Sequence, residues 1–320
     1  MNVILIILDA LRYDHVNSEN TPNLMELAKK GVFFTNATSC NSSTIVSLPY
    51  ILCGKKDYDS EKNIASILFN AGVHTAMIHS NPILHKFYPG FEDSIDLKSN
   101  KIRLDKRWKK LIRNNLPSNL INRMKKVRAA LYEDDKYLPY SRAGETLEFS
   151  RNWMNDHEDY FLWIHIMEPH IPYYPLRTSL KLTRHDMRIL NDKLIESVYK
   201  NYQPTNEEIE QANKLYSEEI KEMDEELGNF FKVLNSDDLL VITSDHGEEF
   251  GEHGQFSHHE NKMVPELIHV PLIFYGKDVK KGLVVNKQIY TSSIGQTILN
   301  SLKIDNKLGE SLSIWSIIKN

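Results

Sequence analysis

The chain has few cysteines and no long hydrophobic run. Only two of its 320 residues are cysteine, Cys40 and Cys53, and neither stands in a paired CxxC or Cys/His zinc pattern. The sequence therefore argues against a disulfide framework and against a structural zinc finger. No stretch approaches the roughly 20 apolar residues that cross a bilayer. The apolar run at residues 3–8 has neither the basic start nor the small-residue cleavage site of a signal peptide, so we expect a cytoplasmic protein.

The chain also lacks a strong overall charge, which is −4 for 39 basic and 43 acidic residues. This balance gives no reason to expect nucleic acid as a partner. The charge is unevenly distributed, because twelve Lys or Arg residues face one acid, Asp105, between Leu97 and Arg128. Apolar residues interleaved with these charges predict a basic helical insertion over residues 97–142. Residues 98–128 could contact an anionic membrane peripherally, and a solvated helical insertion is the alternative.

Short apolar runs rich in Ile and Val alternate with segments of helical periodicity along the chain. This pattern is typical of buried parallel strands joined by helices, and it predicts a single α/β domain over residues 1–320. Strands are expected at 2–8, 32–34, 73–78, 160–166, 238–243 and 270–275, and helices at 22–30, 61–71, 144–157 and 206–234. A polar loop is expected at 35–43. In open α/β sheets, ligand sites lie beyond the carboxyl ends of the strands.

Acidic residues follow two of the predicted strands at that edge. Asp9 follows the first strand, and Asp245 with His246 follows the strand at 238–243, in a loop with further glycines and histidines. Each could instead cap a turn or form a local hydrogen-bonded pair. If the two strand ends converge, carboxylate oxygens and imidazole nitrogen favour a divalent ion such as Zn or Mn, whereas an all-oxygen set would suit Ca or Mg better.

Several segments resemble, in the same order, the motifs of the sulfatase family within the alkaline phosphatase superfamily. The resemblance covers roughly residues 1–95 and 142–275, and leaves the basic insertion outside. It implies a mixed, mostly parallel sheet sandwiched by helices, and a metal-dependent enzyme. The matching segments are 8–15, 71–81, 168–173, 216–228, 243–254 and 266–272.

The resemblance also assigns candidate site residues. The family nucleophile falls on Thr44, some ten residues before Gly54. Sulfatases proper carry there a cysteine within Cys-x-Pro-x-Arg, whereas the Thr-x-x-Ser-x-Pro pattern of this chain resembles the phosphoethanolamine transferases. The resemblance does not decide whether His258 or the adjacent His259 points into the site. The implied metal ligands are Asp9, Thr44, Asp245 and His246; the catalytic residues are Thr44 and His170; the substrate-binding residues are Arg12, His258 and His259, with pairing to Asp14 as the alternative for Arg12.

The threonine at the nucleophile position bears on the reaction. A threonine hydroxyl is a poor nucleophile at neutral pH, and metal coordination is a direct way to activate it. A sulfated threonine has no easy way to expel sulfate, so phosphodiesters, phosphomonoesters or phosphonates are the favoured substrates, cleaved through a covalent threonine intermediate. The alternatives are a sulfatase without formylglycine and a catalytically silent protein that binds an anion or glycan. The expected partner is an anionic ester substrate, such as a glycan or lipid headgroup.

Overall fold

The computed structural model describes residues 2–98, 101–103, 138–199, 202–235 and 237–320. Most of the predicted insertion at 97–142, including most of the basic stretch at 98–128, lies outside the described residues. At its start, Lys101–Arg103 forms a short strand, β5, antiparallel to β4 (Asp93–Asp96). The prediction of helix is therefore wrong for these three residues, which pair with an existing sheet edge.

A ten-stranded sheet forms the centre of the molecule, in the order β10-β2-β8-β7-β1-β6-β3-β4-β5, with β9 paired to β2. The first strand, β1 (Val3–Leu8), lies between β6 (Tyr160–Ile166) and β7 (Leu239–Ser244) and runs parallel to both. The long strand β8 (His269–Gly276) is antiparallel to its two neighbours, β7 and β2. The predicted mixed, mostly parallel α/β sheet is confirmed. The remaining strands are β2 (Val32–Thr38), β3 (His74–His79), β9 (Leu283–Val285) and β10 (Ile289–Tyr290).

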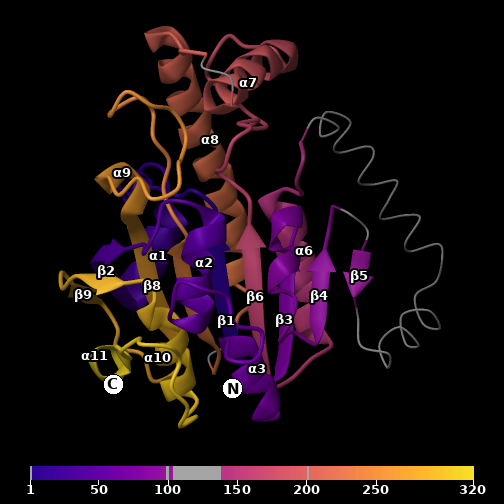
Figure 1. Ribbon diagram of the computed structural model, residues 1–320, viewed down its shortest axis with the longest axis vertical. Coiled ribbons are helices and arrows are strands. Elements are labelled where there is room, and N and C mark those ends of the chain that lie inside the picture. The colour runs from indigo at the N-terminus through magenta and orange to yellow at the C-terminus, as the bar shows by residue number, and fades with distance from the viewer. Residues whose placement is uncertain (1, 99–100, 104–137, 200–201, 236) are drawn as a thin grey trace.

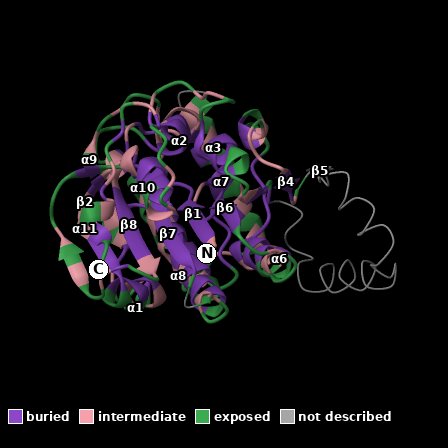
Figure 2. Cartoon of the chain, turned by 90° about the horizontal axis from the view of Figure 1, so that it is seen from below, coloured by how far each residue is buried: buried purple, intermediate pink, exposed green. Residues whose placement is uncertain are grey.

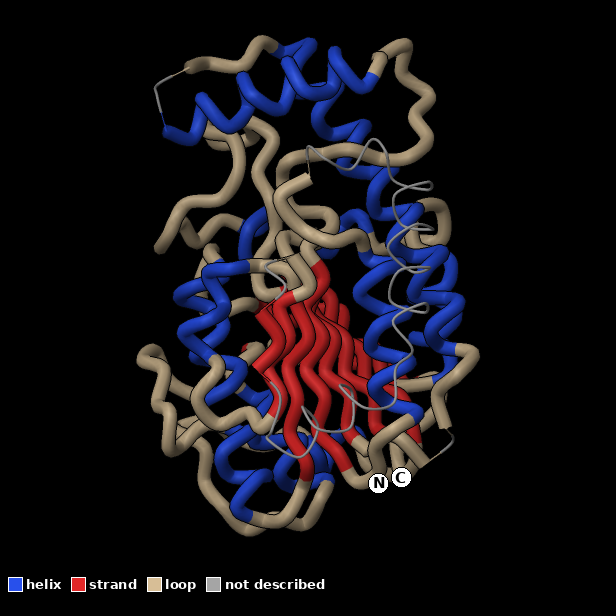
Figure 3. Tube along the Cα trace, turned by 90° about the vertical axis from the view of Figure 1, so that its right-hand side faces the viewer, coloured by secondary structure: helices blue, strands red, loops and turns tan. Residues whose placement is uncertain are grey.

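Helices cover both faces of this sheet (Figure 1 and Figure 3). Alternate residues of β1 point into two separate cores, Ile4 and Ile6 into one and Leu5 and Ile7 into the other. Both cores are fully buried, as the purple strands in Figure 2 show. The first core is supplied by helices α1 (Pro22–Lys30), α6 (Ala143–Asn155), α7 (Arg184–Tyr199) and α8 (Asn206–Phe231). The second is supplied by α2 (Thr44–Cys53), α3 (Ile64–Asn70), η2 (Pro82–Phe87), α10 (Ser293–Ser301) and α11 (Trp315–Ile318). Further short helices are α9 (Pro265–Ile268) and η1 (Tyr13–His15).

The predicted elements match the structure except at a few places. Residues 35–38 were expected in a loop, but they continue β2, which pairs with β8 across a register shift between Phe34 and Ala37. The polar residues Thr35 and Asn36 at this irregularity explain why the pattern indicated a loop. Among the described residues, no helix is both long enough and apolar enough to pass through a membrane.

Helix α8 begins with a capping box that also holds a charged side chain. Thr205 Oγ1 accepts a hydrogen bond from Glu208 N (3.2 Å), and Glu208 Oε2 accepts one from Thr205 N (2.8 Å). Lys193 Nζ of α7 donates to Glu208 Oε1 at 2.7 Å. Burial raises the pKa of Glu208, but the hydrogen bonds from Lys193, Thr205 and Tyr202 outweigh it and bring the pKa to about 2.

Glu208→Gln should therefore lower the free energy of unfolding by about 1–2 kcal/mol at pH 7. A carboxyl group with a lowered folded pKa stabilises the fold fully above its unfolded pKa of 4.5, and this contribution is lost as the pH falls towards 2. Urea unfolding at pH 7 and pH 3 measures the difference, with exposed Glu207→Gln as the control. An equal loss at both pH values would contradict the role of charge.

Candidate active site

The register of the central strands brings two acidic loops together at the carboxyl edge of the sheet. Leu8 of β1 pairs with Ser244 of β7, so Asp9 and Asp245 leave the sheet side by side. Ser244 Oγ donates to Leu8 O (2.6 Å) and accepts from Leu11 N (3.0 Å). Asp245 Oδ1 accepts from Ala10 N at 3.4 Å. Strand ends 235 residues apart in sequence are thus fixed to each other by hydrogen bonds.

The turn after Asp9 depends on an unusual backbone conformation. Ala10 has a φ of 64°, a left-handed value that costs a side-chain-bearing residue on the order of 1–3 kcal/mol. Tyr216 of α8 secures the turn, because its hydroxyl donates to Ala10 O (2.7 Å) and accepts from Arg12 N (2.9 Å). The turn directs the Asp9 carboxylate, which is fully buried, over the end of the sheet.

Thr44 is the first residue of α2 and is held against the Asp245 loop. The preceding residues are fastened to that loop by a contact of Ser39 Oγ with Asp245 O and by a hydrogen bond from Ser42 Oγ to His259 O (2.6 Å). As a result, Thr44 Oγ1 lies 3.1 Å from His246 Nε2 and 3.4 Å from Asp9 Oδ1. The helix N-terminus also offers backbone N–H groups to an anion beside the hydroxyl.

Asp9, Asp245 and His246 form a buried cluster with the composition of a metal site. Their ligand atoms lie within 4.8 Å of one another, with His246 Nε2 at 3.5 Å from Asp9 Oδ1 and 3.7 Å from Asp245 Oδ2. Within the described residues, Asp9 Oδ2 and Asp245 Oδ2 are buried without a hydrogen-bond partner. Unpaired buried carboxylate oxygens are costly, and a cation between them would offset that cost. The residues therefore fit a divalent ion.

The protonation states of the cluster agree with this fit. His246 Nδ1 lies 2.8 Å from Gly247 O, an acceptor, so Nδ1 carries the proton and Nε2 presents its lone pair to Thr44 and Asp9. Burial lowers the pKa of His246 and keeps the ring neutral. Burial and the neighbouring Asp245 raise the pKa of Asp9 well above its usual range. A proton or a metal cation is thus needed to balance the two aspartates.

Two further histidines extend from the cluster toward solvent. The ring centroid of His258 lies 4.3 Å from that of His246 and 5.0 Å from that of His170. His258 Nδ1 lies 3.0 Å from Oε1 of the buried Glu248, whose Oε2 accepts from Tyr173 OH (3.0 Å). Burial and His170 lower the pKa of His258 to about 3. Of the adjacent histidines 258 and 259, the structure places the first against His246, while the second contributes its carbonyl to the Thr44 loop.

Arg12 lies beside the site, and its guanidinium is engaged by the protein. It contacts Asp14 at 2.9 and 2.6 Å, Glu252 at 2.6 Å and the carbonyl of Glu248 at 3.1 Å. These contacts include the pairing with Asp14 that the sequence left as the alternative. They clamp the loop after β1 to residues 248–252, and a contact of Arg12 with substrate stays a prediction.

His165 belongs to the same neighbourhood, although the sequence analysis did not include it among the site residues. It occupies the sixth position of β6, and its Nε2 lies 3.7 Å from Asp9 Oδ2. Within the described residues, neither of its ring nitrogens has a hydrogen-bond partner, and the side chain is fully buried. A histidine in an otherwise apolar, fully buried strand was the available signal, because a buried polar group requires a partner. It therefore lies beside the candidate cation site.

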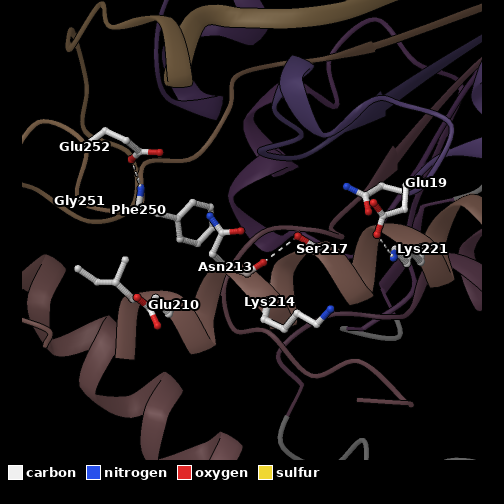
Figure 4. Close-up of a pocket in the computed structure, with 11 residues that line it drawn as sticks. Glu19, Glu210, Asn213, Lys214, Ser217, Lys221, Phe250, Gly251 and Glu252 are labelled. Carbon is white, nitrogen blue, oxygen red and sulfur yellow. Dashed lines mark hydrogen bonds and ion pairs between the residues drawn. The ribbon is translucent and has the colours of Figure 1, made fainter. Parts of the chain in front are cut away.

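A separate hollow lies along α8 (Figure 4). It is lined by Asn213, Lys214 and Ser217 of that helix and by Phe250 and Glu252 of the loop after β7. Among the described residues, the lining of this hollow includes neither Thr44 nor the cluster of Asp9, Asp245 and His246. Glu252 connects the two regions, since it also binds Arg12.

Comparison with solved structures shows a similar fold over almost the whole chain. The phosphonate monoester hydrolase of Silicibacter pomeroyi shares 20% identity with a TM-score of 0.66, covering 99% of this chain and 76% of its own. The soluble domain of the lipooligosaccharide phosphoethanolamine transferase A of Neisseria meningitidis shares 19% identity with a TM-score of 0.63, covering 93% and 86%.

Curated relatives match shorter stretches. A low-salt glycan biosynthesis sulfotransferase of Haloferax volcanii is 30% identical over 156 residues, which are 48% of this chain and 36% of that protein. A phosphopentomutase of Alkaliphilus metalliredigens is 32% identical over 92 residues, 29% of this chain and 22% of its own. The matches thus span about a third or less of these relatives. The Sulfatase family model matches residues 1–304, which shows that the chain belongs to the sulfatase family.

Proposed function

We propose that this sulfatase-family chain is a metal-dependent enzyme that cleaves phosphate-type esters through a covalent intermediate on Thr44. The observation that carries the proposal is the position of the Thr44 hydroxyl, 3.1 Å from His246 Nε2 and 3.4 Å from Asp9 Oδ1, at the start of α2. The hydroxyl thus lies among the side chains that would hold an activating ion, and the helix start offers N–H groups to the anion that it attacks.

Asp9, Asp245, His246 and Thr44 would hold the divalent ion. When bound, the ion lowers the pKa of the threonine hydroxyl and withdraws electron density from the ester. The mixture of oxygen and nitrogen donors favours Zn or Mn.

Protein side chains would carry out the nucleophilic attack and the proton transfer to the leaving group. Thr44 Oγ attacks phosphorus and forms phosphothreonine while the ester oxygen of the leaving group departs. His170, whose ring centroid lies 5.0 Å from that of His258, would supply the proton that this oxygen takes up. Water or an acceptor hydroxyl then attacks phosphorus and restores Thr44. Glu248 holds His258 through Nδ1 and so directs its Nε2 away from the carboxylate.

Sulfate esters are the second candidate substrate. The sulfotransferase relative acts in glycan biosynthesis, and one structural neighbour was solved with D-glucosamine-2-N,6-O-disulfate. The hydroxyl at Thr44 favours phosphorus, because a threonine ester cannot expel its group through a second hydroxyl as formylglycine does.

Parallel assays of aryl phosphodiester, phosphonate and sulfate esters test the proposal. We expect phosphorus esters to be turned over after chelation and reloading with Zn or Mn, and chelation alone to abolish turnover. Dominant sulfate turnover would contradict the choice of phosphorus. A chain that binds no divalent ion and turns over none of the three would instead support a silent binding protein.

A further inference from the structure

A second group of side chains of the metal-binding types lies at the amino ends of the strands, whereas Asp9 lies at the carboxyl ends. His74 is the first residue of β3 and Asp93 the first residue of β4, and His157 lies two residues beyond the end of α6. Because β3 and β4 run parallel to β1 through β6, these residues stand at the amino edge, whereas Asp9 stands at the carboxyl edge. Figure 1 shows β3, β4 and α6 next to one another.

Both histidines direct the same ring nitrogen toward one carboxylate oxygen. His74 Nε2 lies 3.1 Å and His157 Nε2 4.0 Å from Asp93 Oδ2, and the three ligand atoms lie within 4.8 Å of one another. Only 1% of the Asp93 side chain and 7% of the His157 side chain are exposed. Trp153 Nε1 donates to Asp93 Oδ2 at 3.1 Å and stacks on His157, so the carboxylate and one ring are fixed.

The outer nitrogens of the two rings face acceptors. His157 Nδ1 lies 2.6 Å from Trp153 O, and a carbonyl can only accept, so this nitrogen carries a proton. His74 Nδ1 faces Glu92 Oε2 at 3.5 Å. Metal-binding histidines usually donate their outer N–H to a carbonyl or carboxylate in this way.

The inner nitrogens of the two rings point toward the same carboxylate oxygen. With the proton on Nδ1, the neutral His157 ring presents the lone pair of Nε2 to Asp93 Oδ2. An ion between these atoms would bind all three side chains, and a proton held between His74 and Asp93 is the alternative.

We propose that His74, Asp93 and His157 form a second divalent-cation site, separate from the Thr44 centre, that takes zinc or a similar ion. Two imidazole nitrogens and one carboxylate oxygen are donors that zinc accepts. The ion would join the starts of two strands to the segment after α6, and so it would stabilise the fold without touching substrate.

Zinc stoichiometry tests the site independently of any substrate. Chelator-stripped protein carrying Asp245→Asn, which weakens the Thr44 centre, is titrated with zinc chloride by calorimetry, alone and combined with His157→Gln. We expect one zinc fewer per chain in the combined variant, and a zinc-dependent rise in melting temperature that His157→Gln abolishes. Equal stoichiometry in the two proteins would overturn the proposal and leave a proton on His74 as the balancing charge.

A milder variant covers the case in which His157→Gln does not fold. Glu92→Gln changes a side chain that is 25% exposed and removes the negative charge behind His74, while its amide oxygen can still accept from Thr75 N, which donates to Glu92 Oε2 at 3.2 Å in the parent. Its zinc affinity at this site should fall by about 10–100-fold, with an unchanged circular dichroism spectrum. His185→Gln, an exposed histidine of α7, is the matched control and should bind zinc as the parent does. Unchanged affinity in Glu92→Gln would count against the assignment.

Discussion

Thr44→Ala is expected to reduce kcat on phosphorus esters by on the order of 10⁴-fold or more, the scale of losses seen when a nucleophile is removed. The Thr44 hydroxyl lies 3.1 Å from His246 Nε2 and 3.4 Å from Asp9 Oδ1. The hydroxyl of the preceding residue, Ser43, is buried and has no hydrogen-bond partner among the described residues. Metal content should stay near that of the parent, because Asp9, Asp245 and His246 remain.

Thr44→Ser is the matched control, since it keeps the attacking oxygen and should retain most of the turnover. Acid quenching during turnover, followed by mass spectrometry, should show a phosphoryl group on the peptide containing Thr44 in the parent and none in Thr44→Ala. Turnover by Thr44→Ala at the parental rate, with a full complement of metal, would place the nucleophile elsewhere.

The strands and the acidic cluster follow from local sequence signals. The apolar run that ends at Asp9 and the run that ends before Asp245 each read as a buried strand, and parallel packing then requires their polar ends to share one edge. These apolar runs therefore predict the ends of β1 and β7 to within one residue. The nucleophile position came from resemblance instead, because no local signal distinguishes Thr44 from the hydroxyl residues around it.

Other features of the site arise only from contacts between distant residues. The left-handed conformation of Ala10 is stabilised by Tyr216, 206 residues away, and no sequence pattern around Ala10 predicts it. Arg12 is engaged by Glu252, 240 residues away. His165 was not among the predicted site residues, yet the pleat of its strand turns that position toward Asp9. Charged and strained groups of this kind are specified by tertiary packing.

The buried carboxylates of the acidic cluster serve the proposed function but oppose the stability of the metal-free fold. Asp9 and Asp245 each keep one buried oxygen without a hydrogen-bond partner in the described part of the protein. A site that attracts a cation this strongly must destabilise the fold when the cation is absent. Stability measured with and without metal therefore reports on the site more directly than activity alone.

The effect of Asp9→Asn on the free energy of unfolding should change sign when metal is bound. In metal-free protein at pH 7, the amide removes a buried carboxylate and should raise the free energy of unfolding by about 1–3 kcal/mol. Burial and Asp245 raise the folded pKa of Asp9 above its unfolded value. The contribution of Asp9 to the stability of the metal-free parent is therefore most favourable below its unfolded pKa of 3.8 and declines as the pH rises toward the folded pKa, whereas Asp9→Asn lacks this decline.

Saturating zinc or manganese should invert the order, because an ion that binds only the folded parent adds about 2.7 kcal/mol at 100 times its Kd. The variant should gain much less and should lose turnover by on the order of 10³-fold. Urea unfolding with chelator and with metal measures both states, and Asp305→Asn, an exposed carboxylate, should behave as the parent in each. If Asp9→Asn were less stable than the parent without metal, the Asp9 carboxylate would be compensated within the protein itself, and the argument for a cation between the two aspartates would fail.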